Sequence, residues 1–117
     1  DRIDMEEDGA VIMDFKTSEI KTQKDADKRT KESMQLALYA LAYKTVFGQF
    51  PKRVELYFLE SGIIGTNQIR ESDLEKVKDK IGEVSQGIRD RNFAATPAYM
   101  ACQYCAYNQI CPFAIIR

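Results

Sequence analysis

The chain has 117 residues, 44% of them hydrophobic and 30% charged, which is typical of one soluble globular domain and excludes a disordered or collagen-like chain. No apolar run approaches the roughly 18 residues of a membrane span and no signal-peptide pattern is present, so we expect a cytoplasmic protein without a membrane partner. The formal net charge of −1 means that any nucleic-acid binding must come from a local patch. The absence of histidine excludes histidine-based catalysis and Cys/His zinc fingers within this chain, and three cysteines are unsuited to a disulfide framework.

Two strands are expected at the start, at residues 1–5 and 10–16, with a hairpin turn at Asp8-Gly9 between them. The second strand is nearly continuous in apolar residues until Asp14, which is typical of a buried strand that presents polar groups at its end. Residues 19–31 are polar and carry a local positive excess, and we expect a loop there.

A long amphipathic helix is predicted over about 31–47, because apolar residues recur at helical spacing and Gly48 stands at the position of a C-terminal cap. Residues 54–59 then predict a third strand, which Gly62 ends. A short extra strand is possible within residues 62–70.

A second helix is predicted over 72–90, where a capping box precedes one apolar stripe. This order of strands and helices predicts an α/β fold with a central mixed sheet flanked by helices. We divide the chain into a core at residues 1–97 and a cysteine-rich tail of the same domain at residues 98–117.

Asp14 and Lys16 are the first candidates for chemistry. Residues two apart in a strand face the same side, so a carboxylate and an ammonium group emerge together at the end of an apolar strand. A carboxylate is a ligand for Mg²⁺ or Mn²⁺, and a neighbouring lysine can orient a water or stabilise charge on a phosphoryl centre. A surface ion pair at a strand end is the alternative interpretation.

Other polar residues can join this pair. The hairpin can bring either Asp1 or Asp4 beside Asp14, and spacing alone does not choose between them. Gln35 and Tyr39 are four apart and share one helix face. They either belong to the core or face the carboxylates, where they can hold a phosphate or the lysine.

The tail contains Cys102, Cys105 and Cys111 in a C-x2-C-x5-C pattern. Thiolates at this spacing suit an iron–sulfur cluster or zinc, although both usually take four ligands. Three reduced thiols packed in an aromatic tail are the alternative.

Three patterns together carry a family resemblance: the opening run DRIDx4GxVIMDFKTS, the helical run QLALYALA and the strand VELYFLE. In this combination the chain resembles the RecB-like branch of the PD-(D/E)xK nuclease superfamily. More narrowly, it is similar to the nuclease domains of UvrD/PcrA-type helicases and of the AddA and AddB subunits.

The resemblance implies a restriction-endonuclease-like core and a Mg²⁺ or Mn²⁺ cofactor. The implied metal ligands are Asp1, Asp14 and the backbone carbonyl of Phe15, with Asp4 as a second, non-ligand aspartate, Lys16 as the catalytic lysine, and Gln35 and Tyr39 as a Gln-x3-Tyr motif.

The cysteine spacing equals that of AddB-like and some CRISPR-associated RecB-like nucleases, where a distant upstream cysteine completes a [4Fe–4S] site. The family's upstream histidine, the glycine before Asp1 and the fourth cysteine are all missing here. Each would lie before residue 1, so we expect an N-terminally truncated nuclease domain.

By this resemblance the chain is a metal-dependent DNA exonuclease or endonuclease in a helicase–nuclease of DNA repair or recombination, with DNA and a helicase domain or subunit as partners. The residues expected to contact the DNA backbone, unless they form only a solvated loop, are Lys21, Lys24, Lys28, Arg29 and Lys31. Two alternatives are a catalytically silent RecB-like module that binds DNA or acts as a scaffold, and a zinc-binding interaction domain.

Overall fold

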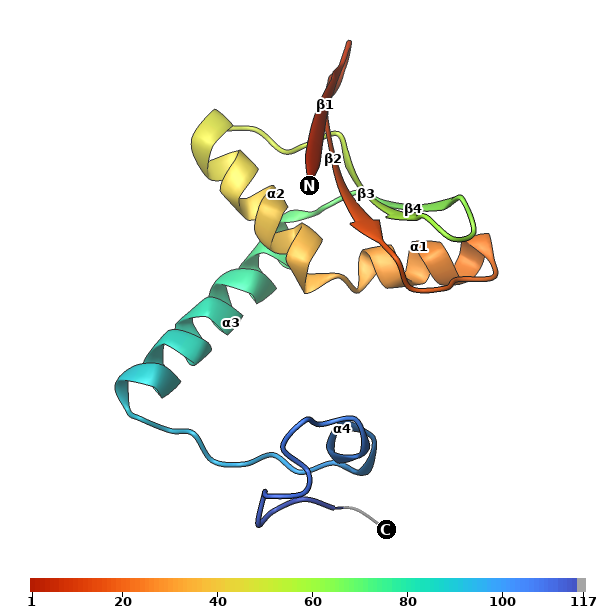
Figure 1. The fold of residues 1–117 in the computed structure, drawn as a ribbon. Coiled ribbons are helices and arrows are strands. Elements are labelled where there is room, and N and C mark those ends of the chain that lie inside the picture. The colour runs from red at the N-terminus through yellow and green to blue at the C-terminus, as the bar shows by residue number, and fades with distance from the viewer. Residues whose placement is uncertain (116–117) are drawn as a thin grey trace. The chain divides into compact units, whose positions relative to one another are not determined.

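The structure is a computed structural model that describes residues 1–115. In chain order its elements are β1 (Arg2–Glu6), β2 (Gly9–Lys16), α1 (Gln23–Lys31), α2 (Met34–Phe47), β3 (Arg53–Phe58), β4 (Ile63–Asn67), α3 (Glu71–Arg89) and α4 (Tyr99–Gln103) (Figure 1). The chain forms two compact units, of which the first is Asp1–Gly82 and the second begins at Glu83.

In the described part of the chain one four-stranded sheet has the order β1-β2-β3-β4. β2 and β3 are parallel, whereas β1 pairs with β2 and β4 pairs with β3 in the antiparallel sense. The sheet is therefore mixed, and the predicted α/β fold class with flanking helices is confirmed.

The β1–β2 hairpin has the predicted turn, with Glu6 opposite Gly9 in the register. Gly9 has a φ of 144°, in the region that favours glycine, and an added Cβ would lie 3.2 Å from the Cβ of Lys52. A glycine is thus suited to this turn both by backbone conformation and by space.

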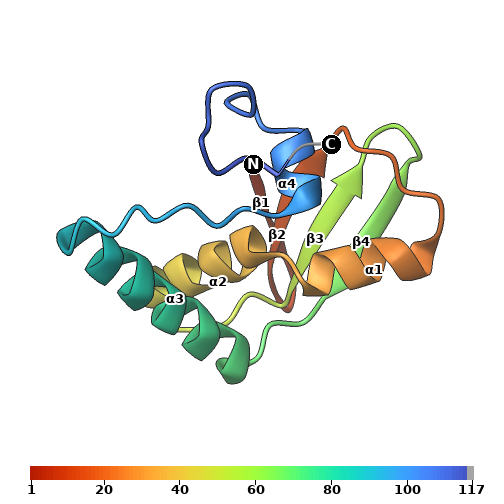
Figure 2. The ribbon, with the colours of Figure 1, turned by 90° about the horizontal axis from the view of Figure 1, so that it is seen from below.

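Helices α1 and α2 form the crossover between β2 and β3 and cover one face of the sheet (Figure 2). Alternate residues of each strand point to that face. The hydrophobic core lies between this face of the sheet and the two helices. Its apolar side chains include Ala10, Ile12, Val54, Leu56 and Phe58 from the strands and Ala26, Leu36, Ala40 and Tyr43 from the helices.

Helix α1 corrects the prediction of a loop over residues 19–31. Thr22 caps the helix, because its Oγ1 accepts the Asp25 N–H at 3.1 Å. Ala26 and Thr30 are the buried residues of α1, and both lie against Gly65 of β4, where an added Cβ would clash with them. A helix that docks through two small side chains carries no apolar stripe, so hydrophobic periodicity could not reveal it.

The same helix covers the outer edge of β4. The Gln23 side chain donates to the Ile64 carbonyl at 2.7 Å, and the Thr66 N–H donates to Asp27 Oδ1 at 2.9 Å. Unpaired backbone groups of an edge strand invite pairing with another chain. Two polar side chains of α1 therefore satisfy part of this edge within the molecule.

The helix predicted over 31–47 begins three residues later as α2, after a break at Glu32 and Ser33. Ser33 caps α2, since its Oγ accepts the Leu36 N–H at 3.2 Å. At the other end Gly48 has a φ of 73°, and its N–H donates to the Lys44 carbonyl at 2.8 Å. Gly48 is the left-handed C-terminal cap that the sequence predicted.

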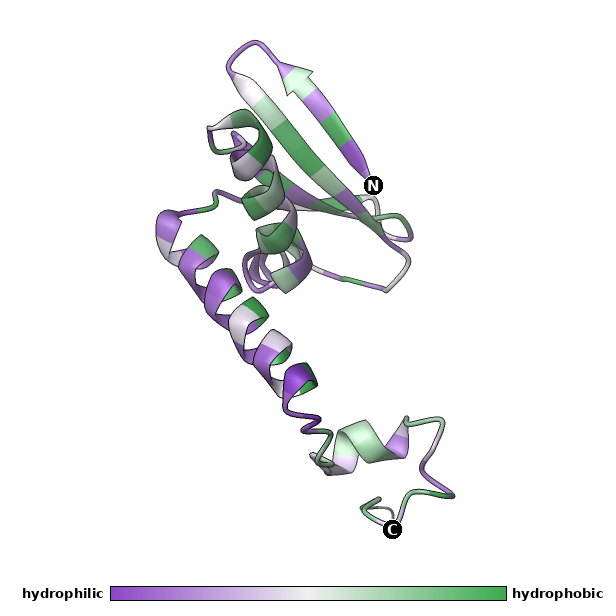
Figure 3. Cartoon of the chain, turned by 90° about the vertical axis from the view of Figure 1, so that its left-hand side faces the viewer, coloured by the Kyte–Doolittle hydropathy of each residue, from purple (hydrophilic) through white to green (hydrophobic). Residues whose placement is uncertain are grey.

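The third strand, the short extra strand and the second long helix all appear, as β3, β4 and α3. Apolar residues run along one side of α3 (Figure 3). Leu74 and Val77 of this stripe are buried, whereas Ile81, Val84 and Ile88 are exposed. Within residues 1–115, no helix is long and apolar enough to span a membrane.

Candidate active site

Asp14 and Lys16 lie at the carboxyl end of β2, on the face that α1 and α2 cover. The Asp14 side chain is 3% exposed and that of Lys16 34%, and Lys16 Nζ lies 2.6 Å from Asp14 Oδ2. The Lys16 ammonium is an ion-pair partner of this buried oxygen, and Asp14 Oδ2 has no partner in hydrogen-bond geometry in the part of the chain that the structure describes. A carboxylate oxygen with this single contact has lone-pair capacity for a further ligand.

Gln35 of α2 bridges the two charged groups of this pair. Its Nε2 donates to Asp14 Oδ1 at 3.1 Å, and its Oε1 accepts from Lys16 Nζ at 2.8 Å. The same Nε2 donates to the hydroxyl of Tyr39 at 2.8 Å, one helical turn further along α2. The helix therefore fixes the orientation of both side chains at the end of the strand.

Asp1 and Asp4 have different surroundings. The Phe15 N–H donates to Asp1 Oδ2 at 2.9 Å, and extending the hairpin register by one residue beyond Arg2 and Met13 places Asp1 opposite Asp14. Asp4 instead lies opposite Val11, and its carboxylate pairs with the Arg2 guanidinium at 2.7 Å. The fold thus brings Asp1, and not Asp4, to the Asp14 end of the sheet.

The oxygen donors at this end suit a hard divalent cation. Asp1 and Asp14 supply two carboxylates at opposite positions of the hairpin, and Phe15, the next residue of β2, donates its N–H to Asp1 Oδ2. Mg²⁺ is typically held by one or two carboxylates and keeps several waters. Residues 1–115 contain no group of three histidine, cysteine or acidic side chains arranged to hold a metal, and a two-carboxylate site does not require one.

The five basic candidates lie on α1 or just before it. Arg29 has defined side-chain contacts: Nη1 lies 3.4 Å from Ser18 Oγ, and Cζ lies 5.6 Å from the centre of the Phe58 ring. Arg29 is exposed, as are Lys21, Lys24, Lys28 and Lys31. Sequence reasoning missed Ser18 and Phe58, whose proximity to Arg29 depends on the parallel pairing of β2 with β3.

The three cysteines of the second unit are all free thiols. Cys102 lies in α4, Cys105 and Cys111 lie in the segment that follows it, and Cys105 is exposed. Among the described residues they do not form a metal-binding cluster. Their role and the boundary between residues 97 and 98 stay predictions.

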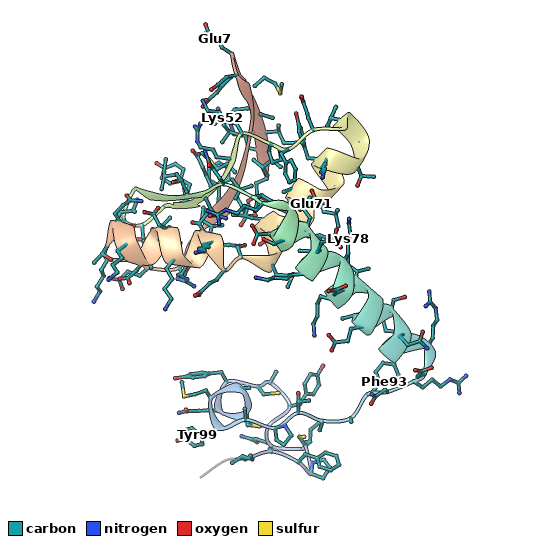
Figure 4. The ribbon with its side chains drawn as sticks, turned by 180° about the vertical axis from the view of Figure 1, so that it is seen from behind. Glu7, Lys52, Glu71, Lys78, Phe93 and Tyr99 are labelled. Carbon is teal, nitrogen blue, oxygen red and sulfur yellow. The ribbon has the colours of Figure 1, made fainter. Side chains whose placement is uncertain are left out.

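A separate group of charges lies at the opposite end of the sheet. Lys52 pairs with Glu6 and Asp8 at 2.7 Å each, and Arg53 binds Glu6 and Glu55 at 2.7 and 2.6 Å. Figure 4 labels Lys52 beside the β1–β2 hairpin. Hydrogen bonds from Arg53, and next from Lys52, lower the pKa of Glu6 to about 2. These pairs tie the hairpin to the start of β3.

The chain belongs to the PD-(D/E)XK nuclease superfamily, whose sequence profile matches residues 1–112. A search of curated proteins found no match. Membership indicates a hydrolase of phosphodiester bonds with a nucleic-acid substrate, and nucleases of this superfamily typically use divalent metal ions. The mixed sheet with its flanking helices is consistent with a restriction-endonuclease-like core.

Proposed function

We propose that the chain is the nuclease domain of a RecB-like, Mg²⁺- or Mn²⁺-dependent deoxyribonuclease. The observation that carries this proposal is the network of Asp14, Lys16 and Gln35, in which a buried carboxylate at a strand end pairs with a positioned ammonium group. A buried charge is costly to maintain. A divalent cation bound by Asp14 would compensate this cost.

Asp1, Asp14 and the backbone carbonyl of Phe15 would hold the metal. When bound, a divalent cation lowers the pKa of a coordinated water and polarises a phosphoryl oxygen. Lys16 orients the attacking water or donates hydrogen bonds to the phosphoryl oxygens as negative charge develops. Gln35 keeps the lysine ammonium in place, and Tyr39 holds the amide of Gln35.

The basic residues on and before α1 would contact the nucleic-acid backbone. Their contribution is electrostatic, so binding should weaken as salt concentration rises. The set comprises Lys21, Lys24, Lys28, Arg29 and Lys31.

For the tail we propose that Cys102, Cys105 and Cys111 supply three ligands of a [4Fe–4S] cluster. Soft thiolates at short spacing support this assignment. Iron and sulfide analysis of anaerobically purified full-length protein tests it. Stoichiometric zinc, or no metal, would instead assign the tail to a zinc module or to packing.

A helicase domain or subunit is the partner we propose, within DNA repair or recombination, and the family resemblance supports this context. A catalytically silent module that binds DNA or acts as a scaffold is the second candidate. Retention of both Asp14 and Lys16 favours the enzyme, because a silent domain has no need of this costly pair.

A divalent-metal titration separates the two candidates. End-labelled and circular DNA are incubated with the purified full-length protein in EDTA, Mg²⁺ or Mn²⁺. If the chain is a nuclease, cleavage should begin when the metal is added and stop when EDTA is added. Cleavage of circular DNA would identify an endonuclease. Binding without cleavage at every metal concentration would favour the silent module.

A further inference from the structure

Arg29 of α1 has a guanidinium held beside the candidate active site by two uncharged partners. Its Cζ lies 5.6 Å from the centre of the Phe58 ring, and its Nη1 lies 3.4 Å from the Ser18 hydroxyl oxygen. Arg29 has no carboxylate partner within residues 1–115. Arg29 is exposed, so its positive charge is accessible, and it is not used in an ion pair among the described residues.

The fold places this charge at the carboxyl end of the two parallel strands. Phe58 is the register partner of Lys16, so both side chains point to the same face of the sheet. Ser18 follows Lys16 by two residues, and the Leu59 N–H donates to the Lys16 carbonyl at 2.9 Å. Ligands of open α/β sheets bind beyond the carboxyl ends of the strands. Arg29 therefore faces the region where substrate meets Asp14 and Lys16.

Lys16 and Phe58 are register partners on adjacent strands, and the Arg29 guanidinium packs on the Phe58 ring. A nucleic-acid strand carries a phosphate for every ~3.4 Å of helix axis. A strand that crosses the carboxyl ends of β2 and β3 would therefore present successive phosphates to Lys16 and to Arg29.

Arg29 also differs in chemistry from the exposed lysines of α1. A guanidinium is planar, stacks on aromatic rings and binds phosphate through two parallel hydrogen bonds. A side chain already held by a ring and a hydroxyl loses less conformational freedom when it binds. Lys24 and Lys28, which are exposed on the same helix, offer mobile point charges.

We propose that Arg29 is a phosphate anchor, which binds a backbone phosphate near the scissile one and positions the strand on Lys16. This inference rests on the proposed nuclease function, and it assigns Arg29 to one particular phosphate of the substrate strand. The competing role is structural: a guanidinium that only covers the Phe58 ring.

The test compares Arg29→Ala, Arg29→Lys and the matched control Lys76→Ala, at an exposed lysine of α3 outside the proposed DNA-contacting set, in the full-length protein. Fluorescence anisotropy measures binding of a short labelled DNA strand in EDTA over a range of KCl concentrations. A second series carries one uncharged methylphosphonate linkage, moved along the strand one position at a time. Cleavage in Mg²⁺ and thermal unfolding are measured for each variant.

For Arg29→Ala we expect affinity to fall about tenfold or more, because hydrogen bonds to charged groups commonly contribute at least that factor. The slope of log K against log salt should fall by about 0.7, the value for one phosphate contact on a single strand. One methylphosphonate position should weaken DNA binding by the wild type and by Lys76→Ala but not by Arg29→Ala. Arg29→Lys should keep the salt slope and lose part of the affinity.

Equal losses for Arg29→Ala and Lys76→Ala would overturn the inference, and so would the same methylphosphonate profile in wild type and Arg29→Ala. In either case cleavage by the wild type leaves the proposed function standing. If Arg29→Ala does not fold, the folded Arg29→Lys variant is used instead. Wild-type DNA affinity in Arg29→Lys would also contradict the phosphate-anchor role. A wild-type protein that neither binds nor cleaves DNA overturns the proposed function and the anchor together.

Discussion

The Lys16 ammonium donates to the side-chain oxygen of Gln35 at 2.8 Å, so a residue of α2 fixes the position of a charge at the end of β2. The two residues are 19 positions apart in the sequence. Docking of α2 on the sheet creates the contact, and the contact defines where the ammonium group meets substrate.

Replacing Gln35 should impair turnover more than substrate binding. In Gln35→Ala the lysine and Asp14 lose their shared partner, and loss of such supporting contacts typically costs 10- to 100-fold in activity. We expect kcat to fall within about that range, with a smaller change in KM, in steady-state cleavage assays. Gln86→Ala, on the surface of α3, is the matched control. Equal kcat values for the two variants would contradict the positioning role.

Gly65 should resist even the smallest enlargement. An added Cβ would overlap the Ala26 carbonyl and the Thr30 hydroxyl of α1, and overpacking of this kind costs about 1–3 kcal/mol. Urea unfolding of Gly65→Ala should therefore show a loss of that size.

Gly82→Ala is the control for this substitution, because Gly82 lies in α3 with open space around its Cα. Alanine is favoured over glycine in a helix by up to about 1 kcal/mol, so this variant should be as stable as wild type or more so. Opposite signs for the two glycines are expected. A Gly65→Ala variant of wild-type stability would show that α1 does not dock on β4 as closely as described.

The ion pairs of Glu6 predict a pH dependence of stability. Arg53 and Lys52 lower the pKa of Glu6 from its ordinary value of 4.5 to about 2. A carboxylate with a depressed folded-state pKa stabilises the fold above the unfolded pKa, and this stabilisation is lost as the pH falls toward the folded value. The urea midpoints of wild type and Glu6→Gln should therefore differ at pH 6 and converge as the pH falls from about 4.5 toward 2.

Salt and a neighbouring residue provide the controls for Glu6. The pairs are partly exposed, so added salt should reduce the difference at pH 6. Glu7→Gln removes an exposed carboxylate next in the chain and should leave the midpoint near that of wild type. A difference between wild type and Glu6→Gln that grows on acidification would contradict the assignment.

The sequence predicted the sheet and its hairpin because their signals are local. Asp8-Gly9 marks the turn, and a run of apolar residues from Ala10 to Met13 marks a buried strand. Helix α1 was not predicted, since its buried residues are only Ala26 and Thr30. The Thr22-x-x-Asp25 capping pattern was the available signal for it.

Candidate site residues could be selected from the sequence, but their geometry could not. Asp1 and Asp4 remained equivalent by spacing, and the hairpin register separates them. The contacts of Gln35 with Asp14 and Lys16, and of Arg29 with Phe58, arise from tertiary packing across the parallel crossover. Such contacts join distant segments and leave no short pattern in the chain.

The most direct test of the account is the Mg²⁺-dependent cleavage rate of Lys16→Ala in the full-length protein. Lys16 lies 2.6 Å from Asp14 Oδ2, and loss of one group that stabilises developing charge typically costs at least about 10²-fold in kcat. Lys76→Ala, at an exposed lysine of α3 outside the proposed DNA-contacting set, serves as the control. The account predicts a loss of about that size or greater for Lys16→Ala alone, with its fold intact by circular dichroism. Cleavage by folded Lys16→Ala at the wild-type rate would contradict it.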